Sequence, residues 1–148
     1  AAASDITVIE NADFKSQSHG LIYGDIIGLN KNIQTDTERS CILAEELGHY
    51  YTSTGDIIDQ TNVQNRKQEH RARMWAYDKL LPLQFFIFAF KHGCHSTHDT
   101  AEFLEVSEEF LKDCINAYHS KYGVFMEVSG YIFIFSENSL NIISKENL

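Results

Sequence analysis

The sequence predicts an α+β protein, and two observations carry that prediction. Short runs rich in β-branched and aromatic residues lie near both ends of the 148-residue chain, and longer segments with apolar residues at helical spacing lie between them. A content of 43% apolar and 12% aromatic residues is enough for a hydrophobic core. No apolar run approaches the ~18–20 residues of a membrane span, so we expect no membrane contact.

Three short strands are expected first. Ile6–Ile9 forms one, and Leu21–Tyr23 with Ile26–Leu29 forms a hairpin around Gly24 and Asp25, because each run is apolar and the dipeptide between them favours a turn.

A half-buried helix follows over Glu38–Tyr51, in which Ile42, Leu43, Leu47 and Tyr50 recur at helical spacing. Thr35 or Asp36 is the expected N-cap, and Gly55 is the expected stop signal in a loop over Thr52–Thr61.

This first helix carries the most informative motif of the chain. Metalloprotease helices bear H-E-x-x-H, in which two histidines four residues apart bind one zinc ion and the glutamate acts as general base. Here Glu46 and His49 occupy the positions of the base and the second ligand, and Glu45 occupies that of the first ligand. Residues i and i+4 share a helix face, so Glu45 and His49 can still converge on one ion. Taken alone, the motif also fits a solvated acidic face with a chance histidine.

A zinc site of this kind needs a third protein ligand. The next helix runs from about Asn62 to Leu81 and ends at Pro82, and it offers two adjacent candidates, Glu69 and His70. Neighbouring helix positions point about 100° apart, so only one of them can face the metal. Ala72, Trp75 and Ala76 mark the packed face of this helix, and helical spacing relative to them leaves both candidates possible.

The two helices together resemble the ImmA/IrrE family of zincin-like metallopeptidases from phages and mobile genetic elements. Some members carry E-E-L-G-H in the first helix, and the second helix reads roughly E-x-x-A-x-x-F-A followed by L-L-x-P. Glu69, Ala72, Trp75, Ala76 and Pro82 match the second pattern, with tryptophan replacing phenylalanine and the two leucines displaced by one position. The likeness covers roughly residues 5–122.

The resemblance implies a minimal zincin-like core over residues 5–82, one zinc ion per chain, and Glu69 as its third ligand beside Glu45 and His49. It also implies an endopeptidase in which Glu46 is the base and the substrate is the repressor of the same prophage or mobile element. Tyr50, Tyr51 and His70 are candidate oxyanion donors, and the hairpin offers an edge for an extended substrate. The alternative is an anti-repressor that binds without proteolysis and keeps a structural or vestigial metal site.

The second half of the chain is expected to form a helical module over residues 83–123 and a C-terminal β-hairpin with a tail over residues 124–148. Helices are predicted at Leu83–Lys91, Thr100–Leu104 and Glu108–Lys121, and strands at Val124–Val128 and Tyr131–Phe135. The last two helices resemble a helix-turn-helix. The second of them begins with two glutamates, which repel phosphates, so we expect a packing or protein-recognition element and no direct DNA binding.

Charge and cysteines exclude other functions. The net charge is −9, and bases outnumber acids only on the second helix, where Arg66, Lys67, Arg71, Arg73 and Lys79 form a face that we interpret as solvated and as compensating nearby acids. Three widely spaced cysteines indicate neither a disulfide framework nor a zinc finger and fit a reducing cytoplasmic compartment. Cys94 lies among His92, His95 and His98, which we interpret as a polar loop tract rather than a metal or nucleophile site.

Overall fold

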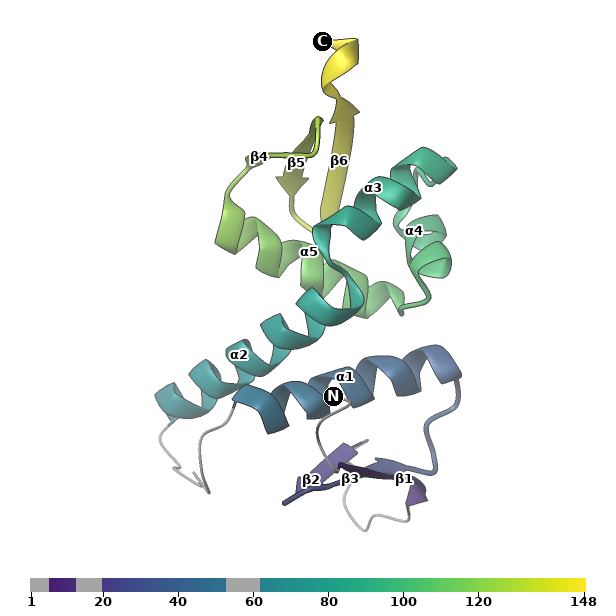
Figure 1. The fold of residues 1–148 in the computed structure, drawn as a ribbon, viewed down its shortest axis with the longest axis vertical. Coiled ribbons are helices and arrows are strands. Elements are labelled where there is room, and N and C mark those ends of the chain that lie inside the picture. Colours follow the sequence, from purple (N-terminus) through teal and green to yellow (C-terminus); the bar gives the residue numbers. More distant parts are fainter. Residues whose placement is uncertain (1–5, 13–19, 53–61) are drawn as a thin grey trace. The chain divides into compact units, whose positions relative to one another are not determined.

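A computed structural model describes residues 6–12, 20–52 and 62–148, in two compact units over residues 1–79 and 80–148. Figure 1 shows the strands and helices of each unit, which we describe separately. The α+β class expected from the sequence is confirmed. Within the described residues, no helix is both long enough and apolar enough to cross a membrane.

The first unit contains a three-stranded mixed sheet rather than the hairpin alone. Strand β2 (Gly20–Tyr23) pairs antiparallel with β3 (Ile26–Asn30) around the expected turn, and β1 (Thr7–Ala12) pairs parallel with β3 on its other side. The order β1-β3-β2 leaves β2 at an edge among the described residues. Parallel pairing of β1 joins residues distant in sequence, which a local pattern does not reveal.

Helix α1 (Asp36–Thr52) lies against this sheet, as Figure 1 shows. The Glu38 N–H donates to the Thr35 hydroxyl at 3.0 Å, so Thr35 is the N-cap. Ile27, Leu29 and Ile33 form the buried centre of the unit, and apolar residues of α1 pack against it: Ile42, Leu43 and Leu47. The core face of α1 is therefore the one that the apolar spacing predicts. The expected loop and its Gly55 lie largely outside the described residues.

Helix α2 (Asn62–Leu80) follows and stops just before Pro82, as expected. Its buried positions in the first unit include Ala72 and Ala76. These are the small residues of the motif on which the family resemblance depends.

The second unit contains three helices: α3 (Leu83–His92), α4 (Thr97–Leu104) and α5 (Glu108–Tyr122). Gly93 ends α3 in the left-handed conformation, with φ 98°, and Ser107 caps α5 by accepting a hydrogen bond from the Phe110 N–H. Helix α4 begins earlier than expected, because Ser96 accepts a hydrogen bond from the Asp99 N–H and caps it. His98 therefore lies on a helix and not in a loop.

A three-stranded antiparallel sheet completes the second unit. Its strands are β4 (Phe125–Val128), β5 (Tyr131–Ser136) and β6 (Ser139–Ser144), in the order β4-β5-β6. A short 3₁₀ helix, η1 (Lys145–Asn147), follows. The expected hairpin is present. The prediction of an unstructured tail after it is wrong, because Ser139–Ser144 form the third strand of the sheet. Asn138, with φ 58°, makes the turn into β6, a conformation that asparagine tolerates better than most residues.

The core of the second unit is built from aromatic contacts between α3, α5 and β5. Phe86 packs edge-on against Tyr118 and Phe133, with ring centroids 6.3 and 6.4 Å apart. The buried Tyr118 hydroxyl donates to the Leu81 carbonyl oxygen at 2.8 Å. This bond satisfies a buried carbonyl just beyond the end of α2.

Candidate metal centre

The two helices of the first unit bring His49 and Glu69 into contact. The distance between His49 Nε2 and Glu69 Oε1 is 3.0 Å, and both side chains keep access to solvent. Two ligands of a tetrahedral zinc ion at about 2.0–2.2 Å are about 3.3–3.5 Å apart. The pair therefore has a donor chemistry that suits a zinc ion, while its 3.0 Å separation is that of a direct hydrogen bond and is slightly shorter than two ligands of one ion require.

Gly48 makes this contact possible. A Cβ atom at this position would overlap the carbonyl oxygen of Ala72 and would lie 2.9 Å from its carbonyl carbon. Only glycine lets α1 approach the backbone of α2 this closely, and the approach brings His49 to Glu69. A glycine inside a helix costs about 1 kcal/mol relative to alanine, so its presence in the sequence is a signal of close packing.

Glu46, three residues before His49 on α1, lies against the start of β2. A Cβ atom built on Gly20 would lie 3.0 Å from Glu46 Cγ. Burial raises the pKa of the Glu46 carboxyl above its ordinary value; His49 opposes that rise, and Glu45 and Glu69 add to it. Glu46 is thus a partly desolvated carboxyl group within electrostatic range of every predicted ligand.

The remaining predicted ligand, Glu45, does not complete a set with the contacting pair. In residues 6–12, 20–52 and 62–148, no group of three or more His, Cys, Asp or Glu side chains is arranged to hold a metal ion. The donors fit zinc in kind, and two of them, His49 and Glu69, are in direct contact. Whether these three residues bind a metal stays a prediction.

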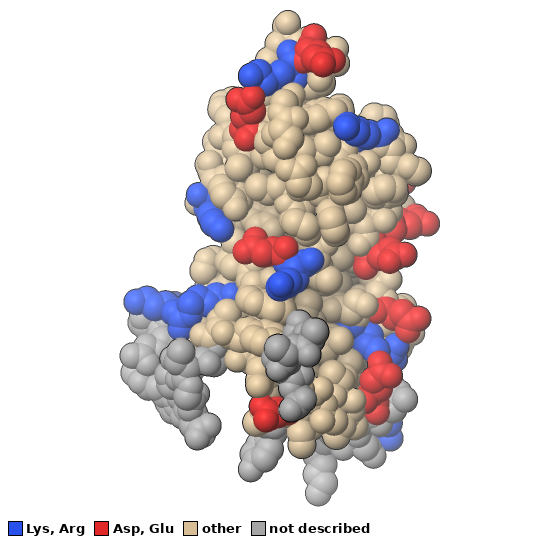
Figure 2. Space-filling model, in the orientation of Figure 1, with Lys and Arg blue, Asp and Glu red and all other residues tan. Residues whose placement is uncertain are grey.

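His70, the rival third ligand, lies in different surroundings from Glu69. It lines a shallow hollow together with Arg66, Lys67 and Arg71. Figure 2 shows the cluster of Lys and Arg side chains that belongs to this part of α2. The contact with His49 belongs to Glu69, its neighbour in sequence. Arg73, one turn further on, places Nε 3.6 Å from the other oxygen of Glu69, a contact that the residue pattern does not predict.

The aromatic residues after His49 have structural partners. The Tyr50 hydroxyl donates to Asp25 Oδ1 at 2.8 Å and so ties α1 to the β2–β3 turn. The Tyr51 ring stacks on the Trp75 ring, with centroids 5.2 Å apart. Lys79 Nζ lies over the Trp75 ring, 5.4 Å from its centroid. Tyr51 and Trp75 thus form a second contact between α1 and α2, close to the candidate centre.

The Cys/His tract of the second unit is dispersed. His92 stacks on Phe103, and His98 Nδ1 lies 2.8 Å from Glu108 Oε1. Burial, with a smaller contribution from Asp99, raises the pKa of the Cys94 thiol, the opposite of what an activated nucleophile needs. Within the described residues, this tract gathers no metal-binding group.

Comparison with known proteins agrees with the helix motifs. The family model described as Peptidase_M78, IrrE N-terminal-like domain, matches residues 1–116, which is most of the chain. No curated protein sequence and no solved structure gives a significant match.

Proposed function

This chain belongs to the ImmA/IrrE family of metallopeptidases, and from that premise we propose that it is a zinc-dependent endopeptidase acting on a protein. The observation that carries the proposal is the contact of His49 on α1 with Glu69 on α2, two motif residues separated by 20 positions in sequence. The proposed substrate is the transcriptional repressor of the same prophage or mobile element, whose cleavage would release its genes.

Glu45, His49 and Glu69 are the proposed ligands of one zinc ion. Carboxylates repel one another, so a cation held by both Glu45 and Glu69 would stabilise the pair. When bound, the ion would supply Lewis acidity toward the scissile carbonyl and the attacking water.

Glu46 is the proposed general base. Its partial burial disfavours the charged form, so its carboxylate is a stronger proton acceptor than an exposed glutamate. It takes a proton from the attacking water and returns it to the amine nitrogen as the peptide bond breaks.

The edge strand β2 positions the substrate in this proposal. An extended peptide can pair with an exposed strand edge through main-chain hydrogen bonds. Gly20, the first residue of β2, lies against Glu46. A peptide paired with β2 would therefore pass the proposed base, without a side chain at Gly20 to intervene.

A cleavage assay tests the peptidase. The repressor encoded beside this chain is incubated with zinc-loaded wild-type protein, Glu46→Gln and Glu38→Gln, and cleavage is followed by mass spectrometry. Glu46→Gln should lose about 10²- to 10⁴-fold in rate, because an amide does not accept the water proton. Glu38→Gln, an acid in the first turn of the same helix, should cleave like wild type. Equal rates for all three would contradict the proposal.

The second candidate is a non-proteolytic anti-repressor. It is favoured by Glu45 at the first ligand position and by the incomplete ligand set among the described residues. Its distinguishing result is a Glu46→Gln protein that removes the repressor from DNA as well as wild type does, with the repressor left intact.

A further inference from the structure

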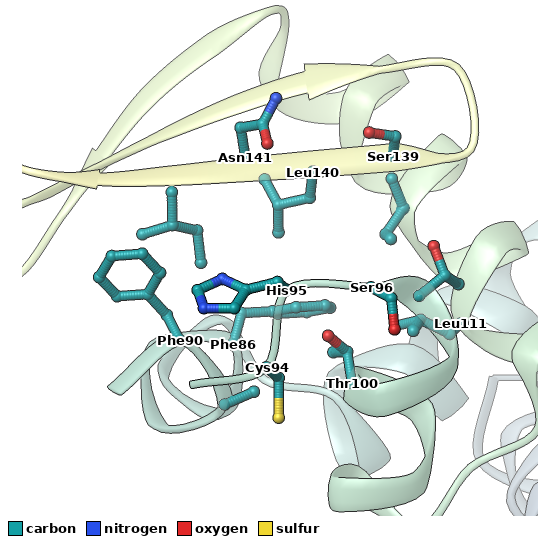
Figure 3. A pocket seen from close by; sticks show the side chains of 14 residues that line it. Phe86, Phe90, Cys94, His95, Ser96, Thr100, Leu111, Ser139, Leu140 and Asn141 are labelled. Atoms are coloured by element: carbon teal, nitrogen blue, oxygen red, sulfur yellow. The ribbon is translucent and has the colours of Figure 1, made fainter. Parts of the chain in front are cut away.

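The second unit contains a cavity of about 180 Å³ between strand β6 and the helices α3, α4 and α5. Figure 3 shows it from close by, with Leu140 on β6 across the space from His95 and Thr100. A cavity of about 150 Å³ accommodates benzene, so this one has room for a six-membered ring with a small substituent. It opens to solvent, because His95 is exposed and Thr100 is only half-buried. A small molecule can therefore enter without unfolding of the unit.

The lining of the cavity is half apolar and half polar. Its apolar residues come from α3, α5 and β6 and include the rings of Phe86 and Phe90. Four of its polar residues lie together in the turn between α3 and α4 and in the first turn of α4: His95, Ser96, Thr97 and Thr100. A ligand in this cavity would meet both aromatic surface and a group of hydrogen-bonding side chains, the combination that is typical of small-molecule sites.

These polar side chains have hydrogen-bonding capacity that the protein does not use. Among the described residues, none forms a hydrogen bond with the side chain of His95, Thr97 or Thr100. The Ser96 hydroxyl accepts a bond from the Asp99 N–H and keeps its own proton for donation. A hydroxyl can both donate and accept, and so can a neutral imidazole. The group therefore suits a ligand that carries a donor and an acceptor side by side, as a carboxamide does.

The lining also favours a ligand without charge. None of the described lining residues is Lys, Arg, Asp or Glu. A charged ligand would lose hydration in the cavity without gaining an ionic partner. A purely apolar ligand would displace water from the hydroxyls and leave them without a partner. The lining thus selects an uncharged ring with a polar substituent over both alternatives.

We propose that this cavity binds a small uncharged aromatic amide. Its ring would pack against Phe86 and Phe90, and its carboxamide would bond to the polar side chains of residues 95–100. The family match does not imply this site, because the match ends at residue 116 and β6 lies beyond it. The site lies in the second unit and does not depend on the proposed peptidase activity.

Nuclear magnetic resonance titration of the whole 148-residue chain tests this proposal with three probes of similar size. Benzamide carries the ring and the amide, benzoate is its charged counterpart, and toluene has the ring without a hydrogen-bonding group. Benzamide should bind with a Kd of about 1 mM and shift the signals of His95, Thr100, Leu140 and Ile142. Benzoate and toluene should each bind at least about tenfold more weakly.

Two substitutions at one position form a matched pair. Thr100→Val replaces the hydroxyl by a methyl group of similar size, whereas Thr100→Ser keeps the hydroxyl. Benzamide binding should weaken about tenfold in Thr100→Val and stay near the wild-type level in Thr100→Ser. Toluene should bind Thr100→Val as well as wild type or better, a result that a general disturbance of the cavity would not give. Thermal unfolding confirms that both variants fold.

Three results would overturn the proposal: no saturable shifts at 10–20 times the expected Kd, roughly the range that such a titration needs, equal binding of the three probes, or equal benzamide binding by the two variants. Saturable shifts confined to residues outside the lining would also refute it. The comparison of probes on the wild-type protein requires no variant. None of these outcomes bears on metal binding or on cleavage by the first unit.

Discussion

At the scale of single residues, the proposed zinc site depends on which of two neighbours on α2 faces α1. Glu69 contacts His49, whereas His70 lines a hollow with basic residues. The residue pattern alone leaves both open, because it places adjacent helical positions only relative to the packed alanines of α2. The decisive information is the position of α1, which no pattern within α2 contains.

The first residue-scale prediction separates these neighbours. Glu69→Ala should lower zinc affinity by at least about tenfold, because it removes a ligand, and His70→Ala should leave it unchanged. Isothermal titration with zinc measures both. The assignment fails if the His70 variant loses affinity and the Glu69 variant keeps it.

The second residue-scale prediction concerns Glu45, which stands where the usual H-E-x-x-H motif has its first histidine. Glu45→His restores two histidines four residues apart and replaces a carboxylate with a neutral imidazole, which is an equally good zinc ligand. We expect zinc affinity to be kept or raised, and the bound ion to retain more positive charge. Glu45→Ala should lose affinity. Identical zinc affinity in all three proteins would show that residue 45 does not contact the metal.

At the scale of elements, the order and type of most helices and strands follow from local patterns. Capping by Thr35 and Ser107 and the left-handed Gly93 are properties of a few adjacent residues, and each was predictable. Two features were not. The parallel pairing of β1 depends on residues far apart in sequence, and β6 depends on a turn at Asn138 that lacks the usual glycine.

The close approach of α1 and α2 yields an element-scale prediction. Gly48→Ala gains about 1 kcal/mol of helix propensity but forces a methyl group into the Ala72 backbone, which cannot rotate away. We expect a net loss of about 1–2 kcal/mol in the free energy of unfolding, together with a loss of zinc affinity. Ser40→Ala, an exposed substitution on the same helix, is the control and should be neutral or stabilising.

Fluorescence can follow this change, because Trp75 is the single tryptophan of the chain and stacks on Tyr51 of α1. Its emission should shift in Gly48→Ala and not in Ser40→Ala. An unshifted spectrum with wild-type stability would mean that α1 and α2 are not in this contact.

At the scale of the whole molecule, the chain forms two units, and the candidate metal centre lies in the first of them, while the second is rich in aromatic residues. The candidate ligands all lie in residues 1–79, and the buried Tyr118 lies in residues 80–148.

Tyr118→Phe leaves the Leu81 carbonyl without its hydrogen bond and should lower the free energy of unfolding by about 1–2 kcal/mol. Zinc binding should not change. Tyr122→Phe, its neighbour on α5, is the control and should unfold like wild type in a urea titration.

The family assignment also belongs to this scale. Two helix motifs predicted it, and the match over residues 1–116 confirms it. The substrate, by contrast, is a property of a partner that neither the motifs nor the fold contains. It stays a proposal derived from the family.

The central claim is that α1 and α2 together hold one zinc ion, and the metal content of purified protein tests it most directly. Inductively coupled plasma mass spectrometry should find about one zinc per chain in wild type, and far less in His49→Ala and in Glu69→Ala, each folded by circular dichroism. Zinc content in both variants equal to wild type, or a folded wild type that binds no zinc when it is supplied in excess, would contradict the account.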